Sequence, residues 1–206
     1  HSNSQTIMDN ISIACEDGNG YVAETHYMRM FNLFTQFGIN SPFYLDSITF
    51  GVEKVNTVSG TVTIHVDVYT ISGSMAWANL TPLASTTTTV TASDNLSMVQ
   101  VPLSATIPMG GIIVVDINHG HGRPPSPNVF GFKIGANTLG QSALSWFASD
   151  TCGVSDPSDM GGLGFPLVHL IINAWGRTVA DIENTEIDHQ VTISTNPLTG
   201  DVLSVS

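Results

Sequence analysis

Acidic side chains gather in two loop-like segments, and carboxylates at this density are suited to binding a calcium ion. Calcium takes about six to eight oxygen ligands, which carboxylates and backbone carbonyls supply. The candidate ligands are Glu16, Asp17, Asp150, Asp156 and Asp159. Each segment also contains a cysteine, so a bond between the cysteines would bring the carboxylates together. We therefore expect a structural calcium ion here. Solvated turns are the alternative, because Asp, Asn and Gly favour turns and neither segment has EF-hand spacing.

The two cysteines, Cys15 and Cys152, are 137 positions apart in the chain. Neither belongs to a CxxC pair or to a Cys/His cluster, which argues against a zinc site. In a secreted chain the pair predicts a disulfide, and two buried free thiols are the alternative. Closing so long a loop would stabilise the fold by roughly 5 kcal/mol in the chain-entropy model.

Two predicted strands carry outward-facing side chains that could bind a ligand. Alternation along residues 62–71 and 167–175 places these side chains in two groups: His65, Asp67 and Tyr69, and then His169, Asn173 and Trp175. If both strands belong to one sheet, that face combines aromatic rings with hydrogen-bonding groups. Such a face suits sugars, whose rings have apolar CH faces and hydroxyl rims. A solvent-exposed face with ordinary cross-strand pairs is the alternative.

Sequence patterns that would indicate catalysis are missing. The chain has no Gly-x-Ser-x-Gly elbow, no His-Glu-x-x-His motif and no glycine-rich phosphate loop. The spacing of its Ser, His and Asp residues singles out no triad. A carboxylate pair for glycoside hydrolysis is assembled by the fold, so the sequence leaves that option open. We predict no catalytic residues and a protein that is not an enzyme.

The charge balance limits the classes of partner. The chain has 206 residues, a formal net charge of −12 and only five basic residues. No basic patch can form, which argues against binding nucleic acid or anionic membranes. An acidic surface suits calcium and neutral or cationic partners, or simply solubility. No run of 18 apolar residues predicts a membrane span, and no signal peptide is visible, so we expect that a leader was cleaved or left out.

Regular alternation predicts an all-β chain with little helix. Thr, Val and Ser are abundant, as is typical of strands, and no segment keeps a helical apolar period. The predicted strands cover residues 12–15, 26–33, 45–55, 62–71, 85–91, 97–101, 111–118, 129–134, 143–148 and 167–175. About ten short strands separated by turns predict a two-sheet antiparallel sandwich over residues 1–176. An acidic linker, 177–190, and a strand-like tail, 191–206, follow.

One charged residue interrupts an apolar alternation. Arg29 alternates with Tyr27, Phe31 and Leu33, which predicts that its side chain is partly buried. A buried arginine needs a partner. The sequence offers Glu24, Asp46 and Glu53 as candidates, in a structural role.

Several segments together resemble a jelly-roll accessory module found in large secreted, often flavobacterial, bacterial proteins. The matching pieces are residues 4–7, 12–15, 29–33, 48–53 and 68–70, together with 152–154 and 164–166. The resemblance spans roughly residues 1–176 and implies a jelly-roll sandwich beside proteases, glycoside hydrolases or adhesive repeats. It implies no catalytic residues for the module itself.

The tail carries a second resemblance. Residues 191–205, VTISTNPLTGDVLSV, look like the opening of a type IX secretion sorting domain, with Thr195 where the first Pro of its Pro-Asn-Pro turn is usual. A whole sorting domain is several times longer, so we read the tail as a truncated copy. Its pieces 191–194 and 202–205 are also strand-like, and an unpaired strand can add to the sheet edge of a neighbour.

Two functions follow from these observations. We expect a secreted or cell-surface binding module of a larger protein, with a polysaccharide or cell-surface glycan as its ligand. The alternative is a structural or adhesive subunit that self-associates through residues 191–206.

Overall fold

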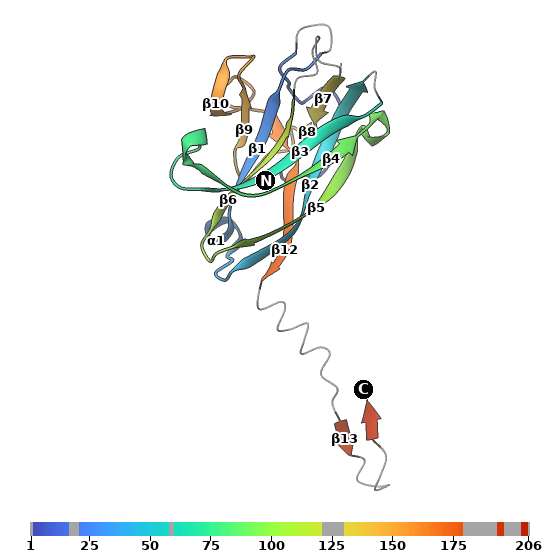
Figure 1. Cartoon of the computed structure of the whole chain (residues 1–206), viewed down its shortest axis with the longest axis vertical. Coiled ribbons are helices and arrows are strands. Elements are labelled where there is room, and N and C mark those ends of the chain that lie inside the picture. The colour runs from blue at the N-terminus through green and yellow to red at the C-terminus, as the bar shows by residue number, and fades with distance from the viewer. Residues whose placement is uncertain are drawn as a thin grey trace.

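The computed structural model describes residues 2–16, 21–57, 60–120, 130–178, 193–195 and 203–205. Two antiparallel sheets pack face to face in it (Figure 1). The predicted all-β, two-sheet antiparallel sandwich is confirmed, whereas its jelly-roll connectivity stays a prediction.

The larger sheet has six strands in the order β10-β9-β1-β6-β3-β4. Their bounds are β1 Thr25–Asn32, β3 Val62–Ile71, β4 Leu80–Val90, β6 Ile112–His119, β9 Ser145–Ser149 and β10 Val154–Asp159. The alternation of apolar and polar residues along β3 decides which of its faces is buried. Val62, Ile64, Val66 and Val68 are buried against the other sheet, while His65 is exposed on the outer face.

The smaller sheet has four strands built around one long strand. It contains β2 Phe43–Thr57, β5 Ser97–Ile107, β7 Phe130–Ile134 and β12 Ile172–Thr178. One edge of β2 pairs with β5, and the other pairs first with β12 and then with β7. A two-stranded sheet, β8 Ala136–Asn137 with β11 His169–Leu170, flanks it.

Within the residues that the structure describes, three short helices and two paired tail strands complete the elements. They are α1 Leu33–Phe37, η1 Trp77–Asn79, η2 Ala92–Asp94, β13 Ile193–Thr195 and β14 Leu203–Val205. In α1 the Asn32 side chain accepts a hydrogen bond from the Thr35 N–H, and Gly38 ends the helix at a φ of 69°. None of the described helices has the length and apolar character needed to span a bilayer.

The core lies between the two large sheets and is rich in aromatic and β-branched residues. Tyr27 of β1 contacts Phe132 of β7 edge-on, with 6.1 Å between ring centroids, and Phe50 of β2 contacts Phe132 at 6.5 Å. All three side chains are fully buried. Such edge-to-face contacts between the two sheets stabilise the core beyond the burial of the rings alone.

Two segments illustrate where the predicted strands differ from the structure. Residues 12–15 form no strand, because the N–H groups of Ile11 and Ser12 donate to the buried carboxylate of Glu53 instead of to a neighbouring strand. In addition, the sequence did not predict β10. Its residues show no apolar alternation, and β10 pairs with β9 through an irregular register. Tertiary contacts therefore determine the conformation of both segments.

The predicted disulfide between Cys15 and Cys152 is confirmed, with 5.8 Å between the two Cα atoms. It ties the N-terminal segment to the turn between β9 and β10. The pairing of β12 with β2 includes Arg177 and Thr178, which pair with Tyr44 and Phe43. Most of the expected linker and tail lies outside the described residues.

Candidate functional site

A surface groove lies where α1, the start of β2 and the end of β12 come together; Figure 1 shows these elements at one end of the sandwich. Its volume is about 410 Å³. Aromatic and aliphatic side chains form most of its lining, and none of the lining residues carries a charge. Its lining includes Gln5, Phe37, Phe43, Asn173 and Trp175. A mostly apolar hollow with a few polar groups is typical of a small-ligand site.

Trp175 is the most exposed aromatic side chain of this groove, with 57% of its surface accessible, against 45% for Phe37. It pairs with Ser47 of β2, and the register shifts between Trp175 and the next residue, Gly176. A Cβ atom at Gly176 would clash with the Tyr44 carbonyl and the Phe43 ring. Glycine at this position therefore lets the last strand lie close against β2 while Trp175 stays at the surface.

Two side-chain amides provide polar groups at the rim. Asn173 Nδ2 donates a hydrogen bond to Gln5 Oε1 at 2.6 Å. This bond orients both amides and leaves Asn173 Oδ1 as an acceptor and Gln5 Nε2 as a donor for a ligand. Arg177, two positions after Trp175, forms an ion pair with Asp46 at 2.9 Å. The groove thus offers an indole ring and two amides.

His169, predicted to share a face with Asn173 and Trp175, lies elsewhere. It is only 6% exposed, and its Nδ1 accepts a hydrogen bond from the Gly140 N–H at 3.0 Å. Burial lowers the pKa of His169, and the positive charge of Arg29 adds to this effect. The alternation fails because the strand is interrupted at Ile171, whose backbone bonds to Gly51 and Gly135.

The first predicted group, His65, Asp67 and Tyr69, does share the outer face of β3. However, β3 belongs to the six-stranded sheet and β12 to the four-stranded one. The single face expected from combining the two groups is therefore not formed. Strand order is the reason, because β3 pairs with β4 and β6, whereas β12 pairs with β2.

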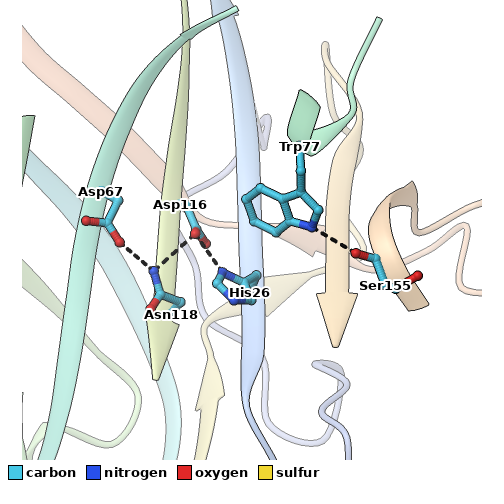
Figure 2. A network of polar contacts seen from close by, with 6 residues as sticks. All are labelled: His26, Asp67, Trp77, Asp116, Asn118 and Ser155. Carbon is cyan, nitrogen blue, oxygen red and sulfur yellow. Dashed lines mark hydrogen bonds and ion pairs between the residues drawn. The ribbon is translucent and has the colours of Figure 1, made fainter. Parts of the chain in front are cut away.

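Asp67 belongs to a polar network on that outer face (Figure 2). Asn118 Nδ2 donates to Asp67 Oδ2 at 2.8 Å and to Asp116 Oδ2 at 3.0 Å. Asp116 Oδ2 also lies 2.7 Å from His26 Nδ1. Three neighbouring strands, β3, β6 and β1, thus contribute to one chain of hydrogen bonds.

The electrostatics of this network depend on the pair formed by His26 and Asp116. Asp116 is fully buried, and its Oδ1 has no hydrogen-bond partner among the residues that the structure describes. Burial raises the pKa of Asp116, while its bonds from His26 and Asn118 act in the opposite direction. Burial also disfavours the charged His26 ring, but the bond to Asp116 and the charges of Asp116, Asp67 and Glu24 outweigh it and raise the pKa of His26.

The predicted calcium ligands are mostly engaged with protein groups. Glu16 forms an ion pair with Lys133 at 2.9 Å. Asp156 accepts from the Trp77 N–H, Asp159 accepts from the Gly162 N–H, and Asp150 lines a shallow hollow. Asp17 lies outside the described residues. Within the described ranges, no three His, Cys, Asp or Glu side chains form a group that could hold a metal. Calcium therefore stays a prediction.

Arg29 is fully buried, as its alternation predicted, but its hydrogen bonds do not go to the expected acids. Its guanidinium donates to the carbonyls of Leu170 and Ala143, both at 2.8 Å, and to the side-chain oxygen of Gln141 at 3.1 Å. Burial lowers the pKa of Arg29 to about 10. The expected carboxylate partner is thus wrong, and neutral oxygens satisfy the charge.

The sequence interpretation missed several residues of both sites. In the groove they are Gln5, Phe37 and Phe43, and in the network they are His26, Asp116, Asn118 and Trp77. A signal was present for Asp116, because a carboxylate inside an apolar strand has to be paired. Gln5 gave no such signal, since it lies in an irregular segment far from β12 in the sequence.

Comparisons with known proteins identify the fold only. No family model and no curated protein matches this sequence. Among solved structures, the chain is similar to the crystal structure of the cysteine protease and lectin-like domains of Cwp84, a surface layer associated protein of Clostridium difficile. The TM-score is 0.51 at 17% identity, over 77% of this chain and 33% of that one.

A second similar structure is the clostridial cysteine protease Cwp84 after propeptide cleavage. Its TM-score is 0.50 at 16% identity, over 77% of this chain and 37% of that chain. The chain therefore spans only 33% of one matched chain and 37% of the other. Similar folds serve many functions, so function has to be argued from the site.

Proposed function

We propose that this chain is a non-catalytic, secreted glycan-binding module whose site is the groove at Trp175. The exposed indole beside a hollow is the observation that carries the proposal. An indole ring offers a flat apolar surface on which the CH face of a sugar ring can stack. The amides of Asn173 and Gln5 lie at the rim, where they would bond to hydroxyl groups.

The charge of the site favours a neutral glycan. None of the groove residues is charged, and the chain as a whole carries a net charge of −12. A sulfated or uronic-acid polymer would be repelled by this field and would meet no cation in the groove. The ligand class we infer is therefore an uncharged polysaccharide with an exposed CH face.

The structural similarity is compatible with this proposal. The Cwp84 crystal structure is described as that of the cysteine protease and lectin-like domains of a surface layer associated protein. A module with a comparable fold would act at a cell surface or in a secreted protein, and we propose that location for this chain.

The proposal is tested with Trp175→Ala against a panel of neutral polysaccharides, namely β-glucan, xylan and mannan, in affinity electrophoresis. We expect the wild type to be retarded by at least one polymer and Trp175→Ala to lose at least about tenfold in affinity, as for a stacking residue at the centre of a site. Phe165→Ala is the matched control, because Phe165 is 43% exposed but does not line the groove. Equal binding by Trp175→Ala and wild type would exclude this groove as the site.

Self-association through residues 191–206 is the second candidate. Its supporting observation is that the described tail strands β13 and β14 pair with each other and belong to neither large sheet. A hairpin of this kind has strand edges with which another copy could pair. Molar mass would be measured by light scattering for the whole chain and for a chain ending at Thr178. A monomer in both cases would reject this candidate.

A further inference from the structure

A second hollow opens on the six-stranded sheet, where residues 67–69 of β3 lie beside residues 82–85 of β4, and we call it the β3–β4 hollow. Its volume is about 340 Å³. It shares no lining residue with the groove at Trp175, which lies against strands of the other large sheet. The hollow is therefore a candidate site separate from the groove.

A β-bulge lies at the centre of this hollow. Val68 of β3 pairs with Ala84 of β4, but the next residue, Tyr69, pairs with Pro82, so Leu83 is an extra residue in β4. An extra residue of this kind bends the strand and redirects the side chains beside it. Residues on both sides of the bulge line the hollow, so the irregular register shapes it.

The polar groups of the hollow are available to a ligand. Among the residues that the structure describes, no protein group bonds to the hydroxyls of Tyr69 and Ser85 or to Oδ1 of Asp67. The acids considered for calcium differ, because Glu16, Asp156 and Asp159 are engaged with protein donors. The hollow thus combines two hydroxyls and a carboxylate oxygen that can all bond outward.

Neighbouring side chains hold two of these polar residues in place. Oδ2 of Asp67 accepts a hydrogen bond of 2.8 Å from Asn118 Nδ2, which also donates to the buried Asp116 (Figure 2). The ring of Tyr69 contacts Trp77 edge-on, with 6.5 Å between ring centroids. Groups that are already oriented lose less conformational freedom when they bind a ligand.

The chemistry of the lining suits an uncharged sugar. A carboxylate accepts strong hydrogen bonds from hydroxyl groups. Burial raises the pKa of Tyr69 to about 12, so its phenol stays neutral and can both donate and accept. The Tyr69 ring and Pro82 add apolar surface for the CH face of a sugar.

The charge of the hollow argues against two other ligand classes. Asp67 is its only charged lining residue, so an anionic sugar would be repelled. A calcium ion takes about six to eight oxygen ligands, and a single carboxylate is a poor basis for such a site. A neutral saccharide remains the class that uses all of the polar groups.

We propose that the β3–β4 hollow is a second saccharide site, which makes the chain bivalent for a neutral polysaccharide. Asp67 accepts from sugar hydroxyls, and the hydroxyls of Tyr69 and Ser85 bond to others. The ligand class rests on the proposed function of the groove, whereas the position of the site rests on its own lining. Two sites on one rigid body raise retention by a polymer, because the second binding event is intramolecular.

The test counts ligands on the full chain by native mass spectrometry, with cellohexaose, xylohexaose and mannohexaose as probes. We expect the wild type to bind two molecules of at least one probe. Asp67→Ala and Trp175→Ala should each bind one, and the double variant should bind none. Thr89→Ala is the matched control, because Thr89 is exposed on β4 outside the hollow, and it should bind two.

The outcomes separate this inference from the proposed function. One hexasaccharide on both the wild type and Asp67→Ala, with none on Trp175→Ala, would overturn the second site and leave the groove. One on both the wild type and Trp175→Ala, with none on Asp67→Ala, would reject the groove and leave the hollow. Binding that persists in the double variant, or is absent from the wild type, would overturn both.

A second variant covers the case in which Asp67→Ala fails to fold. Ser85 is exposed, so Ser85→Ala should leave the fold intact. It should weaken one of the two binding events about threefold, the order of one neutral hydrogen bond, and leave the other unchanged. Two unchanged binding events in Ser85→Ala would count against the hollow.

Discussion

Asn173 on the last strand of the sandwich donates a hydrogen bond of 2.6 Å to Gln5, which lies 168 positions earlier in the chain. The bond joins the N-terminal segment to β12 and places two amides beside Trp175. The candidate site is thus assembled from opposite ends of the sandwich sequence, and its polar rim depends on a single contact.

The first prediction concerns this amide pair. Asn173→Ala should weaken binding of a neutral polysaccharide by roughly two- to tenfold, because a ligand hydrogen bond contributes about 0.5–1.5 kcal/mol. Gln5→Ala should have a similar effect, since each amide orients the other. Isothermal titration of both single variants and the double variant checks this. Because the two amides interact, the double variant should lose less than both single losses combined. Fully additive losses would contradict the coupling.

The second prediction concerns the disulfide between Cys15 and Cys152. Replacing both with serine should lower the free energy of unfolding by about 2–5 kcal/mol, since the bond restricts a long loop in the unfolded chain. Urea unfolding of the double variant and the wild type would measure the difference. The strands should be unchanged in far-UV circular dichroism of the native double variant. An unaltered urea midpoint would show that the bond contributes nothing to stability.

The third prediction concerns the buried guanidinium of Arg29, which bonds to three oxygens. Arg29→Lys should destabilise the fold by about 2–4 kcal/mol, because one ammonium cannot match the planar arrangement of these acceptors. Lys133→Arg is a control, since Lys133 makes a single partly exposed ion pair with Glu16. Thermal unfolding of both variants checks the contrast. Equal melting temperatures for Arg29→Lys and the wild type would contradict this role.

The fourth prediction is the pH dependence of overall stability. The pKa of His26 is raised in the fold, so its contribution is complete below the unfolded value of about 6.5 and is lost as pH rises through the folded value. The pKa of Asp116 is also raised, because burial penalises its charge, so stability again falls with rising pH. The pKa shift of His169 has the opposite effect on the pH dependence of stability. Its lowered pKa provides stability above about 6.5 that is lost as pH falls.

The raised pKa of His26 therefore predicts a higher melting temperature near pH 6.5 than near pH 8.5, whereas the effect of Asp116 begins at its unfolded value of 3.8. Differential scanning calorimetry at matched ionic strength measures the change. In His26→Asn the decrease between these two pH values should be smaller, whereas in His65→Asn it should be retained. A melting temperature that rises steadily with pH would contradict the assignment of His26 and Asp116.

Much of the local structure could be predicted from the sequence. The strand Val62–Ile71 was predicted with its true bounds, and its alternation correctly placed Ile64 in the core and His65 outside. This works because a side-chain period of two depends only on neighbouring residues. The pairing of Cys15 with Cys152 was predictable because the chain has no other cysteine.

The candidate site was only half predictable. Alternation identified Asn173 and Trp175, but the same rule misplaced His169, because a break in the strand at Ile171 changes the face. It also could not tell that Asp67 and Trp175 belong to different sheets. Strand order is set by pairing between distant segments, and a sequence pattern within one strand carries no information on its neighbours.

By itself, then, the sequence determined the β class, the inward and outward faces of its regular strands, the disulfide and the acidic character of the surface. Each of these depends on composition or on residues close together in the chain. The tertiary structure alone decided the groove, which joins Gln5 to Asn173, and the network, which joins His26 to Asp116. These contacts form only once the strand order brings distant side chains together and burial removes the water that would otherwise satisfy them.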